Sequence, residues 1–117
     1  MTAGFDDIVV TTPTSIAYRR FSNESAHWWL LSALRDMLVT AELQPSDIDG
    51  LTVSSFTLQP DSAVGFTQHA GLALSWLEHL PMGGASGVIA LRRAARAIQC
   101  DDAKIVACLS GDTNQLD

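Results

Sequence analysis

The alternation of apolar runs with polar breaks divides the chain into helices and strands that follow one another in turn. Apolar side chains at helical spacing predict helices at residues 25–41, 63–70 and 86–99. Short runs rich in β-branched residues predict strands at residues 7–12, 51–56 and 104–110. Residues 72–80 fit a strand or a helix. Because strands alternate with helices, the pattern predicts an α/β domain with a mainly parallel sheet.

The helix expected at residues 86–99 has apolar side chains on most of its faces. Its polar residues are Arg92, Arg93, Arg96 and Gln99. A helix that is apolar on most faces is buried on most faces, and its several alanines allow neighbouring elements to approach closely. The sequence therefore predicts a buried central helix that lies between layers.

A glycine-rich turn, Met82-Gly83-Gly84-Ala85-Ser86-Gly87, leads into this helix. Glycine lets the backbone turn tightly and approach another group closely. Ala85 or Ser86 then opens a helix whose first N–H groups have no acceptor within the helix, and such a start favours anions or developing negative charge. We expect a reactive centre at this turn; the alternative is an ordinary tight turn that needs glycine.

The composition of the chain limits the classes of function that it can have. The chain has 117 residues, of which 47% are hydrophobic and 17% charged, as expected for one globular domain. A net charge of −6 argues against a nucleic-acid partner. No stretch is long enough to span a membrane, and the acidic start does not resemble a signal peptide. Two cysteines, Cys100 and Cys108, predict neither a disulfide framework nor a metal site. A cytoplasmic location fits these features.

Three segments, in this order, resemble the thiolase superfamily. Residues 43–53 resemble its L-x-P-x-D-I-D-G-L turn and second strand, and residues 82–98 resemble its active-site turn and the buried helix behind it. Residues 101–112 resemble the strand that follows. The GGASG turn is most similar to the thiolase-like lipid-transfer proteins, which include sterol carrier protein X thiolases and steroid side-chain aldolases. The resemblance implies a layered thiolase-like fold, of which residues 1–117 form an incomplete N-terminal portion.

One position departs from the thiolase pattern. Thiolases carry a nucleophilic cysteine at the turn, where a helix N-terminus lowers the thiol pKa. Aligning Ser86 and Gly87 with that motif places Gly84 at the cysteine position. Glycine has no side chain to acylate, so covalent acyl-enzyme chemistry cannot run through this residue. Cys100 and Cys108 follow the helix and do not replace it.

The resemblance without the cysteine implies an aldolase-like reaction, the retro-aldol cleavage of a β-hydroxyacyl-CoA in lipid or steroid side-chain degradation. Two alternatives stay open: a non-catalytic acyl-CoA-binding or scaffolding subunit, and an acetyl-CoA acyltransferase. The resemblance also implies coenzyme A thioester as substrate with no bound cofactor, a homodimer, and a small partner protein with an OB-fold and a zinc ribbon.

The candidate substrate-binding residues gather around the glycine turn. They are Gly83, Gly84, Ala85, Ser86, Gly87, His69 and His79. Backbone N–H groups of the turn can polarise a carbonyl, while Ser86 is better explained as a helix N-cap than as a nucleophile. No catalytic acid or base is assigned. The tryptophans are expected in the core or at an interface, and the alternative is that they line a lipid pocket. The helix arginines are expected in salt bridges, and the alternatives are contacts with a partner subunit or with a CoA phosphate.

Overall fold

The computed structural model describes residues 4–11, 13–17, 19, 24–55, 62–81 and 85–112, apart from the side chains of Ser62 and His69. Within these residues the helices are α1 (Ala26–Ala41), the short 3-10 helix η1 (Pro45–Asp47), α2 (Ser62–Ala70) and α3 (Ser86–Gln99). The strands are β1 (Gly50–Ser54), β2 (Trp76–His79) and β3 (Val106–Ser110). The predicted α/β class and parallel sheet are confirmed.

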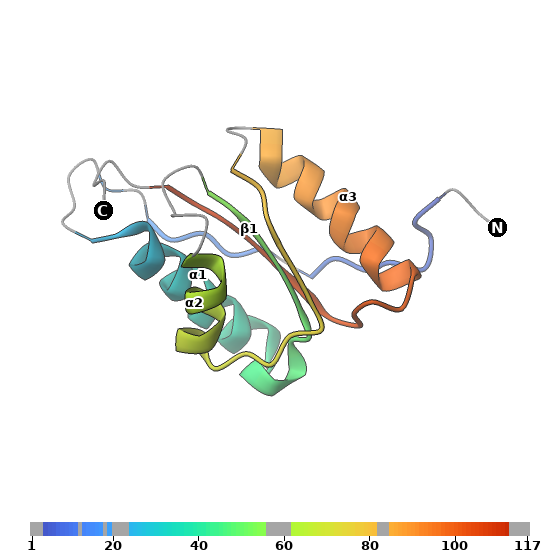
Figure 1. Ribbon diagram of the computed structural model, residues 1–117, viewed down its shortest axis with the longest axis horizontal. Helices are drawn as coiled ribbons and strands as arrows, with labels where there is room; N and C mark the ends of the chain where they lie inside the picture. Colours follow the sequence, from blue (N-terminus) through green and yellow to red (C-terminus); the bar gives the residue numbers. More distant parts are fainter. Residues whose placement is uncertain are drawn as a thin grey trace.

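The three strands form a parallel sheet in the order β2-β1-β3. Thr52 of the central strand pairs with Glu78 on one side and with Cys108 on the other. Helices α1 and α2 lie on one face of the sheet and α3 lies on the other (Figure 1). The chain therefore has three layers, and each connection between strands passes over a face of the sheet as parallel pairing requires.

The core lies between the sheet and the two helices α1 and α2. Central strand β1 is buried along its whole length. Its side chains alternate: Leu51 and Val53 face the core, whereas Thr52 and Ser54 point to the α3 side. The core cluster consists of Ala26, Leu30, Leu34, Leu38, Ile48, Leu51, Val53, Phe66, Leu72, Ala107 and Leu109. Burial of each large apolar side chain contributes about 1.5–3 kcal/mol.

Helix α1 begins and ends at residues that satisfy its free backbone groups. The Ser25 side chain accepts a hydrogen bond from the N–H of Trp28 at 3.2 Å. At the other end Glu42 adopts a left-handed conformation, φ 58°, and its N–H donates back to the last turn. The predicted helix at residues 25–41 is confirmed to within one residue.

Helix α3 has the predicted bounds, but the prediction that it is buried on most faces is wrong for this chain. Its buried alanines include Ala90, Ala94 and Ala97, and the helix packs on β1 and β3. Small side chains let a helix lie close to a sheet. Val88 and Leu91 are 74% and 50% exposed. The described residues supply only one layer against α3, which is why its outer side stays open.

The strand predicted at residues 7–12 does not form in the described residues 4–11. Val9 and Val10 are exposed, and this segment lies instead beside the last turns of α3, where Gln99 Nε2 donates to the Gly4 carbonyl at 2.8 Å. The β-branched run favours a strand, but a strand needs a neighbour to pair with its backbone. Pairing, rather than local propensity, decided this segment.

The remaining predicted elements occur with shorter or shifted bounds. The strand expected at residues 51–56 is β1, and Phe56 lies outside the described residues. The ambiguous residues 72–80 contain the strand β2. Gly71, φ +74°, ends α2 in the left-handed conformation expected after a helix. In the part of the chain that is described, none of the helices has the length and apolar character needed to cross a membrane.

Candidate functional site

The carboxyl ends of the parallel strands and the start of α3 lie at one edge of the sheet. Because β2 leads into α3 and α3 leads into β3, the helix runs antiparallel to both strands and begins where they end (Figure 1). Ligands of open parallel sheets bind at this edge. The structure therefore brings Ala85, Ser86 and Gly87 to the edge at which a binding site is expected.

Hydrogen bonds join the three strand ends. The N–H of Leu80 donates to the Val53 carbonyl at 2.8 Å, and the N–H of Gly111 donates to the Ser54 carbonyl at 3.1 Å. The Ser55 hydroxyl donates to Asp112 Oδ1 at 3.1 Å. Hydrogen bonds therefore fix the end of β1 to both neighbouring strands, and this edge offers a rigid surface for a ligand.

His79, one of the candidate residues, lies at the end of β2 and is half-buried. Its Nε2 lies 3.1 Å from the carbonyl oxygen of Ser55. A carbonyl only accepts, so Nε2 carries the proton and donates it. His79 therefore braces β2 against the end of β1, which leaves Nδ1 as its only acceptor atom.

The other candidate histidine does not join this edge. His69 lies in the last turn of α2. Because α2 runs back from the end of β1 to the start of β2, its last turn lies toward the amino ends of the strands, away from the start of α3. The side chain of His69, and Gly83 and Gly84 altogether, lie outside the described residues.

Ala85, rather than Ser86, is the N-cap of α3, which corrects the N-cap role expected for Ser86. Ala85 makes no side-chain capping bond, and Ser86 is the first helical residue with 2% exposure. The first N–H groups of a helix have no acceptor within the helix. Because Ala85 has no side-chain oxygen, the N-cap residue itself supplies no acceptor to the first N–H groups of α3, which lie at the positive end of the helix dipole.

Two serines and an aspartate at this edge escaped the sequence analysis. Ser54 and Ser55 are 4% and 2% exposed, and Asp112 accepts the Ser55 hydroxyl. Among the described residues, no group makes a hydrogen bond with the buried Ser54 Oγ. Their position after two strands was the available signal, but strand ends rich in serine and aspartate are common in ordinary turns.

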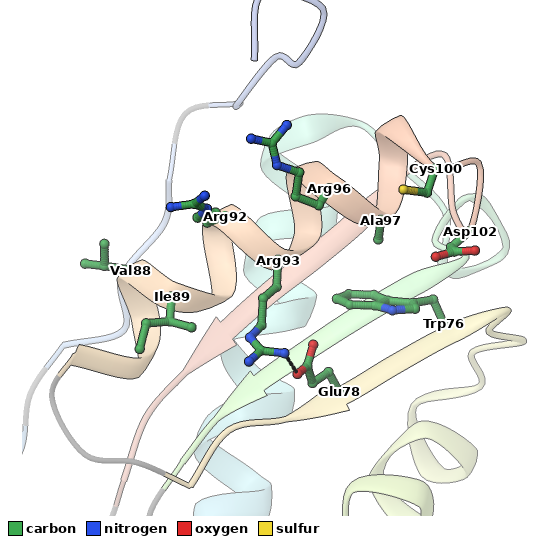
Figure 2. A pocket seen from close by; sticks show the side chains of 10 residues that line it. All are labelled: Trp76, Glu78, Val88, Ile89, Arg92, Arg93, Arg96, Ala97, Cys100 and Asp102. Atoms are coloured by element: carbon green, nitrogen blue, oxygen red, sulfur yellow. Dashed lines mark hydrogen bonds and ion pairs between the residues drawn. The ribbon is translucent and has the colours of Figure 1, made fainter. Parts of the chain in front are cut away.

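A second feature is an open groove of about 730 Å³ between α3 and the edge strand β2. Figure 2 shows Arg93 reaching from α3 to Glu78 on β2. Trp76 lies on the same strand. Arg96 donates to Gln99 Oε1 at 2.7 Å, and its guanidinium lies 4.2 Å from the centre of the Phe5 ring. The expected salt bridge is confirmed for Arg93.

The tryptophans differ in burial. Trp28 is 44% exposed and is not a core residue, while Trp29 and Trp76 are half-buried. The rings of Trp28 and Trp29 meet edge to face, with centres 4.9 Å apart. Trp76 belongs to the groove beside α3, so the three rings do not form one pocket.

Neither cysteine lies at the start of α3. Cys100 is exposed at the far end of the helix, and Cys108 lies in β3 on the α3 side of the sheet. Burial raises the pKa of the Cys108 thiol, and the neighbouring Thr52 hydroxyl partly offsets this rise. A raised pKa is the reverse of what a nucleophilic thiol needs. The described residues also contain no group of three side chains able to hold a metal ion.

Comparison with known proteins shows a similarity to a solved structure. No protein-family model matches the chain, and no curated protein sequence does. The chain is similar to an aldolase. That solved structure, the Ltp2-ChsH2(DUF35) aldolase, is 27% identical and superposes with a TM-score of 0.63. The match covers 74% of this chain and 22% of that one, so the chain spans about a fifth of the relative's length.

Proposed function

We propose that this chain contributes the thioester-binding part of a carbon–carbon lyase that cleaves a β-hydroxyacyl-CoA in lipid or steroid side-chain degradation. The similarity to an aldolase of known structure is the observation that carries the proposal. The glycine at position 84 supports it, because this residue offers no nucleophile for acyl transfer. We propose further that residues 1–117 correspond to the front of a thiolase-like layered domain.

A retro-aldol reaction needs a place for negative charge. A base removes the proton of the β-hydroxyl group, the bond between Cα and Cβ breaks, and Cβ becomes a carbonyl carbon. The electron pair of the broken bond forms an enolate on the thioester, which is then protonated at Cα. Donors aimed at the enolate oxygen lower this barrier. The first N–H groups of α3, which receive no side-chain cap from Ala85, fit that role, and no base is assigned.

A non-catalytic acyl-CoA-binding subunit is the second candidate. The feature that favours it is the start of α3, where the described residues offer backbone donors, while no residue of this edge is assigned as a catalytic base. An acetyl-CoA acyltransferase ranks below both, since Cys100 and Cys108 lie away from this helix start. For all three, we propose a homodimer in the cytoplasm, joined in the lyase by a small OB-fold and zinc-ribbon protein.

Product analysis separates these functions. The full chain, alone and together with its proposed partner, is incubated with a β-hydroxyacyl-CoA, and the products are identified by liquid chromatography with mass spectrometry. We expect a short acyl-CoA and an equal amount of a carbonyl compound. The saturated acyl-CoA of the same length is the control and should stay intact. Binding of the β-hydroxyacyl-CoA without cleavage would support the scaffolding function instead.

A further inference from the structure

The hydroxyl group of Ser54 is a buried polar group with no hydrogen bond among the described residues. The residue is only 4% exposed and ends the central strand. Burying a hydroxyl without a partner costs about 1–3 kcal/mol, and folded proteins contain few such groups. A hydroxyl kept in this state therefore needs an explanation, and a ligand that accepts its proton supplies one.

The strand register places this hydroxyl beside the first turn of α3. Ser54 points to the α3 side of the sheet and pairs with Ser110 on the neighbouring strand. Ser110 Oγ lies 3.9 Å from the position that a Cβ on Gly87 would take. Neighbouring strands are about 4.8 Å apart, so the Ser54 side chain lies roughly one strand spacing from the helix start.

The start of α3 adds donors of its own. Its N-cap, Ala85, makes no side-chain capping bond, and the 14-residue helix places its positive dipole end here. The hydroxyl of Ser55 is engaged by Asp112, and Ser110 is exposed to solvent. Ser54 is therefore the side chain at this edge that combines a buried hydroxyl with an unused donor.

We propose that the Ser54 hydroxyl donates a hydrogen bond to the carbonyl oxygen of a bound thioester, alongside the first N–H groups of α3. This inference rests on the proposed function and adds a side-chain donor to it. A donor held by the central strand cannot move away as charge grows on the oxygen, so its hydrogen bond strengthens from thioester to enolate.

The test uses acetyl-CoA labelled with carbon-13 at its carbonyl, and needs no turnover. The infrared frequency of the labelled carbonyl is measured free and bound to the full chain. We expect a downward shift on binding, and expect Ser54→Ala to lose most of this shift and to bind about tenfold more weakly. Ser54→Cys, which keeps the size but donates weakly, should fall between the two. Ser110→Ala, on the same face one strand away, is the control.

Thermal unfolding separates a ligand role from a structural one. Removal of a hydroxyl without a partner should leave the melting temperature of Ser54→Ala unchanged or higher. An unshifted carbonyl in the unaltered chain, or equal shifts in the unaltered chain and Ser54→Ala, would overturn the inference. So would displacement of acetyl-CoA by inorganic phosphate at similar concentration, which would indicate a plain anion site. A shifted carbonyl with no cleavage of a β-hydroxyacyl-CoA would instead refute the lyase and leave the Ser54 contact standing.

Discussion

The carboxylate of Asp49 binds the backbone of Lys104, 55 positions further along the chain. The Lys104 N–H lies 2.9 Å from both carboxylate oxygens, and the N–H of Ile105 donates to Oδ1 at 2.8 Å. Asp49 precedes β1, and the two donors precede β3. One side chain therefore sets the start of two neighbouring parallel strands.

Replacement of this carboxylate should destabilise the sheet. We expect Asp49→Ala to lower the free energy of unfolding by about 2 kcal/mol, because two backbone N–H groups lose a charged acceptor. Asp49→Asn keeps one oxygen and should lose about half as much. Urea unfolding followed by circular dichroism gives both values. Asp102→Asn, an exposed control, should change little, and a loss as large as that of Asp49→Ala would contradict this explanation.

The ion pair between Arg93 and Glu78 should contribute little to stability. The two side chains are 53% and 25% exposed, and water screens a pair of this kind. A double-mutant cycle with Arg93→Ala and Glu78→Ala should give a coupling free energy of about 0.5 kcal/mol or less at physiological salt. A coupling several times larger would mean that the groove beside α3 is covered in solution.

The sequence predicted the elements whose signals are local. The bounds of α3 and of α1 followed from their apolar patterns. The predictions that α3 is buried on most faces and that residues 7–12 form a strand were wrong, since both features depend on what packs or pairs against them. Local preference does not include a distant partner.

The candidate site was predicted to the same extent. The glycine-rich turn marked the start of α3, because a helix start and its glycines are local features. The bond between Ser55 and Asp112 joins residues 57 positions apart, and the buried state of Ser54 depends on two neighbouring strands and a helix. The side chains at the strand ends therefore emerged only from the fold.

The two cysteines should react at very different rates. Cys100 is exposed, whereas burial raises the pKa of Cys108 and limits access to it. At pH 8 we expect one thiol to react rapidly with a disulfide reagent such as Ellman's reagent, and the second to react only as the protein unfolds. Cys100→Ser should abolish the rapid phase. A rapid phase that persists in this variant would show that Cys108 is accessible.

Cys108 should also make stability depend on alkaline pH. Its folded-state pKa is raised, so the unfolded chain ionises first as pH increases and the folded state binds more protons in that range. The free energy of unfolding should therefore fall as pH rises past the ordinary thiol pKa. Below that pKa the thiol is protonated in both states, and Cys108 adds no pH dependence to stability. Cys108→Ala should reduce this fall when unfolding is measured between pH 7 and 10. An identical pH profile in the variant would contradict the assignment.

Two glycines should respond to alanine in opposite ways. A Cβ at Gly50 would lie 2.8 Å from Val106 Cγ2 and 2.9 Å from the Ala103 Cβ, so Gly50→Ala must push β1 away from its neighbour. We expect a loss of about 1–3 kcal/mol in the free energy of unfolding. Among the described residues, a Cβ at Gly87 meets only Ser110 Oγ, at 3.9 Å, and alanine is the better helix former, so Gly87→Ala should gain up to about 1 kcal/mol. Chemical unfolding of both variants checks the pair.

Gly87 lies in the first turn of α3, so Gly87→Ala also tests the place of the ligand. A stable Gly87→Ala variant with weakened acetyl-CoA binding would show that the ligand needs the open space beside this turn. Unchanged binding would place the ligand nearer to Ser54.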